Sequence, residues 1–440
     1  MAPKSVVYLP IEYRSREFDG KLALATKLTQ LGFVVVIGQQ WAMYENFQSL
    51  PAGVVLFKST NKIHNAGMYR AKVAGHIVAT LEEETLALIS HESILRNCPT
   101  DTYQFVDFLL TTGEVEKQAH AGRGCDPRKL LVTGNPRVDV LKPLFRPLFQ
   151  DAIDQLRARF GDYVLLNTNF GYKNSRWGSI EAARNIEINA GSLNPADPES
   201  VRQFDDMVEW EEENCQAMFE TVTRLAGLFP DRTFIVRPHP IEDVPKVTQQ
   251  YASIPNVKVI QEGPHIPWTL GCAVMLHTSC TTGLEAAIAG KQTASLVTTE
   301  TWASRAFLSN KVNPVFSTVD AIVENTKTIL SGGAGMAPPP LASFENHIRN
   351  IGSTSAIDLI VDFLRKLPYV AGEIKFNPFT VSPRHQILLE KCRISPEDMK
   401  AALKKMAKVH NLPAGAEFPV MPMGDSLFLL PPLNTAVKQS

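Results

Sequence analysis

Short apolar runs alternate with helix-length segments along most of this chain, and this alternation strongly restricts its fold. In the first third, such runs occupy residues 6–9, 34–37, 54–57, 76–79, 108–111 and 130–133. Nearly continuous apolar runs are typical of strands buried on both faces, and helical crossovers between strands make them parallel. The pattern therefore predicts a parallel sheet covered by helices on both faces.

The alternation restarts after a connector at residues 141–157. Apolar runs recur at residues 163–166, 233–236, 257–260, 273–276 and 293–297, and residues 199–228 predict one long helix. A chain of 440 residues usually forms two or three domains. We therefore expect an α/β protein with two doubly wound, Rossmann-like lobes that face a central cleft. The expected parts are residues 1–150, residues 151–366 and a C-terminal extension, residues 367–440.

Composition excludes several classes of protein. Lys and Arg number 44 against 45 Asp and Glu, which argues against nucleic acid as a partner. The chain runs directly from its first residues into a strand-like segment, without the pattern of a secretory leader. The longest uncharged stretch, residues 263–284, is broken by Pro267 and a polar turn, so it is a poor membrane span. The six cysteines form no Cys-x-x-Cys pair, which is typical of reduced thiols. We expect a cytoplasmic protein.

Two loops of the second lobe predict an anion-binding site. Residues 277–283, His-Thr-Ser-Cys-Thr-Thr-Gly, form a hydroxyl-rich turn before a helix expected from about Leu284. Helix N-termini offer unpaired N–H groups and the positive end of the helix dipole, and both attract anions. His239, between two prolines, follows the run at residues 233–236, so both loops lie at the carboxyl edge of the sheet, where ligands bind. Ordinary helix capping is the alternative for the turn.

This region resembles the donor-binding lobe of GT-B glycosyltransferases that use cytidine nucleotides. These include bacterial sialyltransferases, Kdo transferases and the glycerophosphotransferases of teichoic acid synthesis. The resemblance implies that His239 binds the nucleotide phosphate and stabilises it as it leaves, and that Glu285 binds a ribose hydroxyl. Residues 166–171 resemble the start of the second lobe in a group known as surface carbohydrate biosynthesis proteins. The other implied donor-binding residues are Asn169, Pro240, Thr278, Ser279, Thr281 and Thr282.

The first lobe adds two matching segments, and the resemblance covers about residues 5–366. Residues 75–85 resemble the acidic doublet and glycine that supply the catalytic base in GT-B sialyltransferases, although Thr85 stands where glycine is expected. Which of Glu82, Glu83 and Glu84 is catalytic therefore stays open, and we favour Glu83. Neighbouring carboxylates repel one another and raise one pKa toward the range of a base; a solvated helix start is the alternative. Residues 133–139 resemble the Gly-Asn-Pro-Arg-x-Asp turn of such lobes.

Mixed charges follow the first expected strand, at residues 12–20. Arg14 and Arg16 could bind an anionic sugar or acceptor, because guanidinium groups bind carboxylates in a bidentate manner. Asp19 and Lys58 lie at the same expected edge. The alternative is a network in which the arginines pair with Glu12, Glu17 and Asp19.

The leading hypothesis is a metal-independent glycosyltransferase without a cofactor, because no Asp-x-Asp motif follows a strand. It would move an acidic sugar, of the Kdo or nonulosonic acid type, from a CMP-linked donor to a glycan or lipid-linked glycan of the bacterial surface. Three alternatives stay open: a CDP-glycerol or CDP-ribitol phosphotransferase, an enzyme similar to UDP-GlcNAc 2-epimerase, and a non-enzymatic nucleotide-binding pair of lobes.

The C-terminal extension suggests contact with a membrane surface. Residues 396–409 predict an amphipathic helix that carries Lys400, Lys404, Lys405 and Lys408. Basic residues beside apolar ones suit an anionic lipid surface. A further hypothesis therefore places the protein on the inner face of the bacterial inner membrane, without spanning it.

Overall fold

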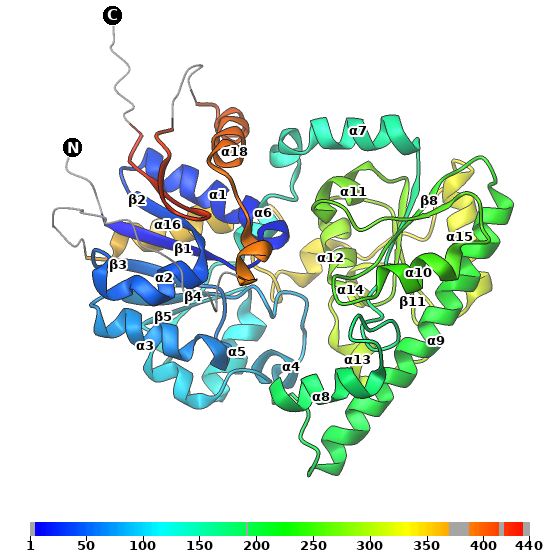
Figure 1. Ribbon diagram of the computed structural model, residues 1–440, viewed down its shortest axis with the longest axis horizontal. Coiled ribbons are helices and arrows are strands. Elements are labelled where there is room, and N and C mark those ends of the chain that lie inside the picture. Colours follow the sequence, from blue (N-terminus) through cyan, green and yellow to red (C-terminus); the bar gives the residue numbers. More distant parts are fainter. Residues whose placement is uncertain (1–4, 191, 369–386, 413–417, 434–440) are drawn as a thin grey trace, which may run out of the picture. The chain divides into compact units, whose positions relative to one another are not determined.

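The computed structural model describes residues 5–190, 192–368, 387–412 and 418–433. These residues form two compact units, each with its own sheet and flanking helices (Figure 1). Unit 1 comprises the described parts of Met1–Leu86, His91–Leu148 and Phe344–Ser440. Unit 2 comprises those of Ala87–Ser90 and Phe149–Ser343.

The described part of unit 1 contains an eight-stranded sheet in the order β13-β14-β2-β1-β3-β4-β5-β6. Its parallel strands are β1 (Val6–Ile11), β2 (Val34–Gln39), β3 (Gly53–Phe57), β4 (Ile77–Leu81), β5 (Phe108–Thr111) and β6 (Leu130–Val132). Most of their residues are buried, which is why near-continuous apolar runs identify them. Two antiparallel strands, β13 (Met421–Gly424) and β14 (Leu427–Leu430), extend the sheet beyond β2.

Helices cover both faces of this sheet. One face packs against α1 (Arg14–Gln30), α16 (Ala356–Lys366) and α18 (Pro396–Val409). The other face packs against α2 (Gln40–Asn46) and α3 (Asn65–Val73). The remaining α-helices in the described part of unit 1 are α4 (His91–Leu95), α5 (Glu114–Gly122) and α6 (Pro136–Asp139).

Unit 2 has a parallel sheet in the order β12-β11-β10-β7-β8-β9 among its described residues. Its strands are β7 (Val164–Asn167), β8 (Phe234–Arg237), β9 (Val257–Val259), β10 (Val274–His277), β11 (Thr293–Leu296) and β12 (Val315–Phe316). One face packs against α9 (Pro198–Leu228), α10 (Val244–Tyr251) and α15 (Val319–Leu330), and the other against α11 (His265–Gly271) and α12 (Thr281–Ile288). The remaining helices are α7 (Gln150–Phe160), α8 (Ile180–Ala190), α13 (Trp302–Ala306) and α14 (Ser309–Val312). The predicted α/β class with two doubly wound, Rossmann-like lobes is confirmed.

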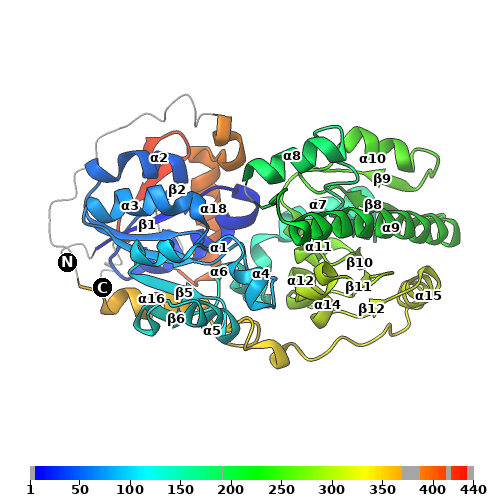
Figure 2. The same ribbon diagram turned by 90° about the horizontal axis from the view of Figure 1, so that it is seen from below.

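The structure divides the chain differently from the expected parts. Residues 344–366 were expected in the second lobe, but they belong to unit 1. The apolar residues of α16 lie in the core of unit 1, and its Phe363 ring packs against the Phe108 ring of β5 with 5.0 Å between their centroids. Figure 2 shows α16 next to that strand. The Asp139 carboxylate accepts a hydrogen bond from the backbone N–H of Ile357 at 2.9 Å, at the start of that helix. The described residues of the expected extension also pack into unit 1 rather than forming a separate part.

The helix predicted at residues 396–409 is α18, and its apolar side is buried. Met399, Leu403, Met406 and Val409 lie in the core of unit 1, whereas Lys400, Lys404 and Lys408 are exposed. No helix in the described ranges is long and apolar enough to cross a membrane. The apolar side of α18 therefore stabilises unit 1, so a contact with lipid would involve its exposed side, which carries the lysines.

Candidate functional site

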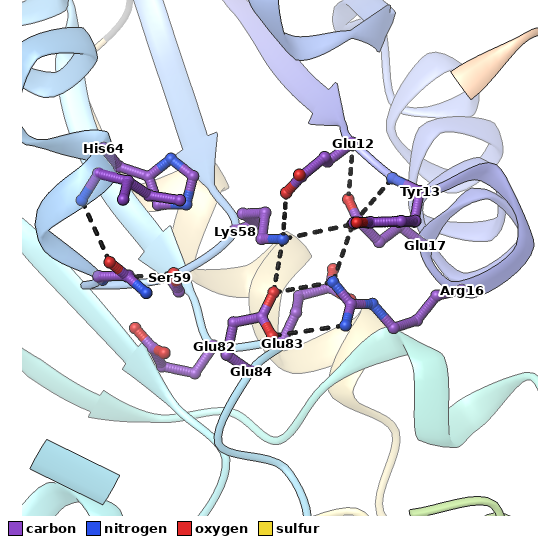
Figure 3. Close-up of polar contacts among 12 residues, drawn as sticks. Glu12, Tyr13, Arg16, Glu17, Lys58, Ser59, His64, Glu82, Glu83 and Glu84 are labelled. Carbon is purple, nitrogen blue, oxygen red and sulfur yellow. Dashed lines mark hydrogen bonds and ion pairs between the residues drawn. The ribbon is translucent and has the colours of Figure 1, made fainter. Parts of the chain in front are cut away.

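A network of charged side chains lies at the carboxyl ends of three neighbouring strands of unit 1 (Figure 3). Glu12 follows β1, Lys58 follows β3, and Glu84 lies just after β4. The Lys58 side chain is 3% exposed, and its Nζ contacts Glu12 at 2.6 Å and Glu84 at 2.5 Å. Arg16 on α1 binds the same Glu84 carboxylate at 2.8 Å. Lys58 therefore connects the ends of all three strands.

A second lysine, Lys21 on α1, is buried beneath this network. Its Nζ contacts Glu17 at 2.8 Å, Glu83 at 3.4 Å and the carbonyl oxygen of Pro10 at 2.6 Å. None of the three ionic side chains is more than 2% exposed. Removal of Lys21 would take this partner from two buried carboxylates, and breaking a buried ion pair costs about 3–5 kcal/mol. Glu83 is therefore held inside unit 1 by an ion pair.

The three glutamates of the acidic run have different environments. Glu82 is buried and accepts the backbone N–H of Thr60 at 2.7 Å, whereas the Glu84 side chain is 37% exposed. Burial raises the pKa of Glu82 well above its usual value, and burial also raises the pKa of Glu83. Burial acts in the same direction on Glu84, but Arg16 and Lys58 outweigh it and lower the pKa of Glu84 to about 2.

The two properties that a general base needs are found on different glutamates of the run. A base must reach the proton that it removes, and its pKa should lie near the working pH. Exposure favours Glu84, while basicity favours Glu82 and Glu83. The assignment of Glu83 as the base stays a prediction. The alternative of a solvated helix start does not describe the run, because the next helix, α4, begins at His91.

The turn at residues 133–139 is hydrogen-bonded to the backbone of the acidic run, residues 82–84. Asn135 donates from Nδ2 to the backbone oxygen of Glu82 at 2.7 Å. Gly134 has a φ of +76°, and a Cβ at this position would lie 2.2 Å from Oδ1 of Asn350. Glycine therefore allows both the backbone conformation and the close approach. Asn350 also donates to Asp139 at 2.7 Å, so the turn attaches the segment before α16 to the sheet.

The two arginines expected to bind an acceptor are paired with carboxylates of their own unit. Arg14 binds Asp398 of α18 at 3.0 Å, and Arg16 binds Glu84 and Glu17. The alternative of an internally paired network therefore describes these side chains, but with Asp398 and Glu84 as principal partners. Asp19 lies half-buried on α1. Acceptor binding by Arg14, Arg16, Asp19 and Lys58 stays a prediction.

A residue of the C-terminal segment also reaches this network. The ammonium of Lys391 lies 4.6 Å from the centre of the Tyr13 ring and 3.7 Å from a carboxylate oxygen of Glu12. Arg16 and Lys58 approach the same ring at 5.2 Å and 5.7 Å. Cations are attracted to aromatic faces at such distances. The segment that contains Lys391 is therefore part of the surroundings of the site.

In unit 2, the hydroxyl-rich turn follows β10 and leads into α12. Cys280 precedes the first residue of α12, and no side chain caps the helix there. Thr278 is buried and donates to Oδ1 of Asn169 at 2.6 Å, in the loop after β7. Thr281 and Thr282 lie half-buried in the first turn. The alternative of ordinary capping by these hydroxyls is therefore not what the structure shows.

Two residues of the turn face the interior. Ser279 is fully buried with a φ of +54°, a strained conformation for a residue other than glycine, and its hydroxyl accepts Nδ2 of Asn310 at 2.7 Å. His277 is also buried, and burial lowers its pKa to about 3. A Cβ at Gly283 would lie 2.3 Å from Nε2 of His277, so glycine allows α12 to pack on β10. The buried contacts of these residues therefore fix the conformation of the turn.

The loop after β8 places His239 half-buried and Pro240 exposed. The backbone N–H of His239 donates to Glu242 at 2.9 Å, and Glu242 also accepts the Thr168 hydroxyl at 2.5 Å, in the loop after β7. The strands β8, β7 and β10 are neighbours in that order. The structure therefore brings the predicted histidine loop and the hydroxyl turn to one edge of the sheet, with the Asn169 loop between them.

Glu285, expected to bind a ribose, lies in α12 with its side chain 1% exposed. One of its carboxylate oxygens lies 2.6 Å from Nε2 of His265, which begins α11. The pair joins two helices that face the same side of the sheet. Donor binding by Glu285, like that by the other residues of unit 2, stays a prediction.

Two side chains that support these sites are not identified by the sequence analysis. Lys21 is one of several lysines in a charged and apolar segment, and only its spacing of four residues from Glu17 indicates a pair. Glu242 lies three residues after His239 in a loop, where an acidic residue is common and carries no distinctive signal. Within the ranges that the structure describes, no three His, Cys, Asp or Glu side chains form a group suited to hold a metal ion.

Comparison with known proteins shows the fold. No family model matches the chain, and no curated protein sequence matches it. Solved structures match over most of its length, and the fold that they share is the GT-B type with two Rossmann-like domains.

Several of these matches are described as UDP-N-acetylglucosamine 2-epimerases. The putative enzyme from Listeria monocytogenes is 14% identical, with a TM-score of 0.50, over 83% of this chain and 96% of its own. The enzyme from Methanocaldococcus jannaschii is 15% identical, also with a TM-score of 0.50, over 82% of this chain and 99% of its own. The wall teichoic acid polymerase TagF matches with a TM-score of 0.48 and 12% identity, over 83% of this chain and 89% of its own.

Proposed function

We propose that the protein is a glycosyltransferase that moves an acidic sugar, of the Kdo or nonulosonic acid type, from a CMP-linked donor to a surface glycan. The observation that carries the proposal is the edge of unit 2 where the His239 loop and the N-terminus of α12 lie on either side of the Asn169 loop. No side chain caps that helix. Its first N–H groups and its dipole suit the phosphate of a nucleotide, and His239 adds a hydrogen-bond donor.

The proposed reaction is transfer of the sugar from the donor phosphate to an acceptor hydroxyl. An acceptor hydroxyl attacks the anomeric carbon of the donor sugar and loses its proton to a carboxylate of the acidic run. The bond between that carbon and the phosphate oxygen breaks, and CMP leaves with the bonding electron pair. His239 and the first turn of α12 stabilise the negative charge that develops on the phosphate. We propose that these groups act without a metal ion or cofactor.

Cytidine nucleotides are expected to bind more tightly than uridine nucleotides. Isothermal titration of wild-type protein with CMP, CDP, UDP and GDP, with and without EDTA, checks this expectation. Because the matched fold also occurs in UDP-N-acetylglucosamine 2-epimerases, UDP is the comparison that matters most. Tighter binding of UDP than of CMP would overturn the cytidine assignment and favour an epimerase or a UDP-sugar transferase. Turnover of CDP-glycerol without sugar transfer would instead identify a phosphotransferase, and binding without turnover of any donor a non-enzymatic protein.

Contact with an anionic membrane surface is proposed to depend on charge alone. The apolar side of α18 is buried in unit 1, so its lysines would act by electrostatic attraction. Wild-type protein is expected to sediment with phosphatidylglycerol vesicles at low salt and to be released at about 0.5 M salt, where screening is strong. The variant Lys400→Glu/Lys404→Glu/Lys408→Glu is expected to stay in the supernatant. Equal sedimentation of the two proteins would contradict this role for α18.

A further inference from the structure

Glu242 is a buried carboxylate beneath the loops that carry the proposed phosphate-binding groups. Its residue is 3% exposed and lies between β8 and α10. One of its oxygens accepts the backbone N–H of His239 at 2.9 Å, the Thr168 hydroxyl at 2.5 Å and the Phe170 N–H at 3.3 Å. The other accepts Nδ2 of Asn174 at 3.1 Å. Burial raises the pKa of Glu242, and these four hydrogen bonds act in the opposite direction because they favour the ionised carboxylate.

These hydrogen bonds connect the loops after two neighbouring strands. Thr168 and Phe170 belong to the loop after β7, and His239 belongs to the loop after β8. The first loop is also connected to the turn after β10, because Thr278 binds Asn169. A chain of contacts therefore runs from the histidine loop through Glu242 to the turn at the start of α12.

The same loop sets the orientation of the imidazole. The backbone N–H of Ile241 donates to Nδ1 of His239 at 3.4 Å. A neutral imidazole that accepts at Nδ1 carries its proton on Nε2. His239 can then donate from Nε2 to a phosphate oxygen without becoming charged. This orientation depends on the backbone position of His239, which Glu242 fixes.

We infer that Glu242 is a positioning residue that holds His239 for binding of the nucleotide phosphate. The inference rests on the proposed function, because it assumes that His239 binds a phosphate. It goes further by assigning the geometry of the histidine loop to one buried carboxylate that does not itself contact the donor. The four hydrogen bonds offset part of the cost of burying a carboxylate beneath an anion-binding loop.

Unit 2 also offers a matched control. Glu211 on α9 is buried to a similar degree, at 5% exposure, and accepts the backbone N–H groups of Tyr172 and Lys173 at 2.7 Å and 3.1 Å. It therefore supports the chain that follows the Asn169 loop, but it has no hydrogen bond to the histidine loop. Loss of either carboxylate should lower stability, and only loss of Glu242 should alter nucleotide binding through His239.

The test is a double-mutant cycle on CMP affinity. Isothermal titration with CMP is carried out on wild type, Glu242→Ala, His239→Ala and the double variant, with thermal unfolding in parallel. We expect Glu242→Ala to weaken CMP binding by about tenfold. In the His239→Ala background the same change should weaken binding by less than about twofold, because the histidine through which Glu242 acts is gone. Glu211→Gln should leave CMP affinity within about twofold of wild type.

Two further results decide the outcome. If Glu242→Ala does not fold, Glu242→Gln replaces it in the same cycle. An amide keeps one accepting oxygen, so a smaller loss of about threefold is expected, again only when His239 is present. Equal losses from the Glu242 change in both backgrounds would overturn the positioning role. No CMP binding by wild-type protein would refute the proposed function itself, which is a different result.

Discussion

Replacing His239 with alanine is expected to weaken CMP binding by about tenfold or more and to slow every reaction of a CMP-linked donor. A hydrogen bond to a charged group contributes about 1.5–3 kcal/mol, which corresponds to a factor of ten to more than a hundred. The imidazole would serve the leaving phosphate, so the slow hydrolysis of the donor by water should fall together with transfer. Titration with CMP and measurement of both rates check this expectation.

A matched control for this variant is His91→Ala. His91 is exposed at the start of α4 in unit 1, and its removal should leave CMP affinity and both rates unchanged. If His239→Ala binds CMP as tightly as wild type and hydrolyses the donor at the same rate, the assignment of the donor phosphate to the histidine loop is wrong.

Changing the catalytic glutamate to glutamine is expected to reduce transfer by about a hundredfold or more while CMP affinity stays within about twofold. An amide keeps the shape of the carboxyl group but cannot take up the proton. The sequence favours Glu83 as the base. The structure exposes Glu84, but Arg16 and Lys58 lower its pKa to about 2, whereas burial raises the pKa of Glu83. We therefore expect the largest loss of transfer in Glu83→Gln. Steady-state kinetics and CMP titrations on Glu82→Gln, Glu83→Gln and Glu84→Gln check this.

Thermal unfolding separates a catalytic loss from a structural one. Glu83→Gln should lower stability, because it removes one of two carboxylates from the buried Lys21. Glu82→Gln should be tolerated better, since burial already favours the uncharged form of that side chain. A folded Glu83→Gln that alone loses transfer would support the choice made from the sequence. Near wild-type transfer in all three would move the search to Glu17 and Asp19.

Much of the fold could be predicted because the strands are buried on both faces. The runs at residues 54–57 and 108–111 match β3 and β5 to within one residue, and the long helix at residues 199–228 matches α9 in the same way. The helix at residues 396–409 coincides with α18. In these segments the apolar residues of the sequence are the ones that the fold buries, so the apolar pattern alone is sufficient to predict the strand or helix.

The first helix and the last strands show where local pattern fails. The chain is helical from Arg14, although charges at residues 12–20 suggest a loop, because Glu17 and Lys21 are paired inside the fold. The strand β13 contains Pro422, which does not suggest a strand, but it lies at the sheet edge, where proline is tolerated. Both segments depend on partners that are distant in sequence.

The sequence predicts which strand ends carry the residues of the candidate site, but not which of these side chains pair with one another. Parallel strands bring their carboxyl ends together, so His239 and the turn after β10 could be placed at one edge of unit 2 from the sequence. The sequence does not predict that Glu242 lies beneath them, because its hydrogen-bond partners come from the segments after two different strands. Likewise, the burial of Glu83 and the exposure of Glu84 depend on α1, which packs against them from another part of the chain.

Residues 344–366 belong to unit 1 although unit 2 precedes them in the sequence, and this order affects how the two units fold during synthesis. A ribosome releases the first six strands of unit 1 long before α16, α18 and β14 exist. While unit 2 is synthesised, the sheet face that α16 and α18 cover and the edge of β2 that pairs with β14 lack these partners. Unit 2 is nearly continuous in sequence and can complete its core first. Because domains generally fold as units during synthesis, unit 2 is expected to complete its core before unit 1 does, although unit 1 begins first in the sequence.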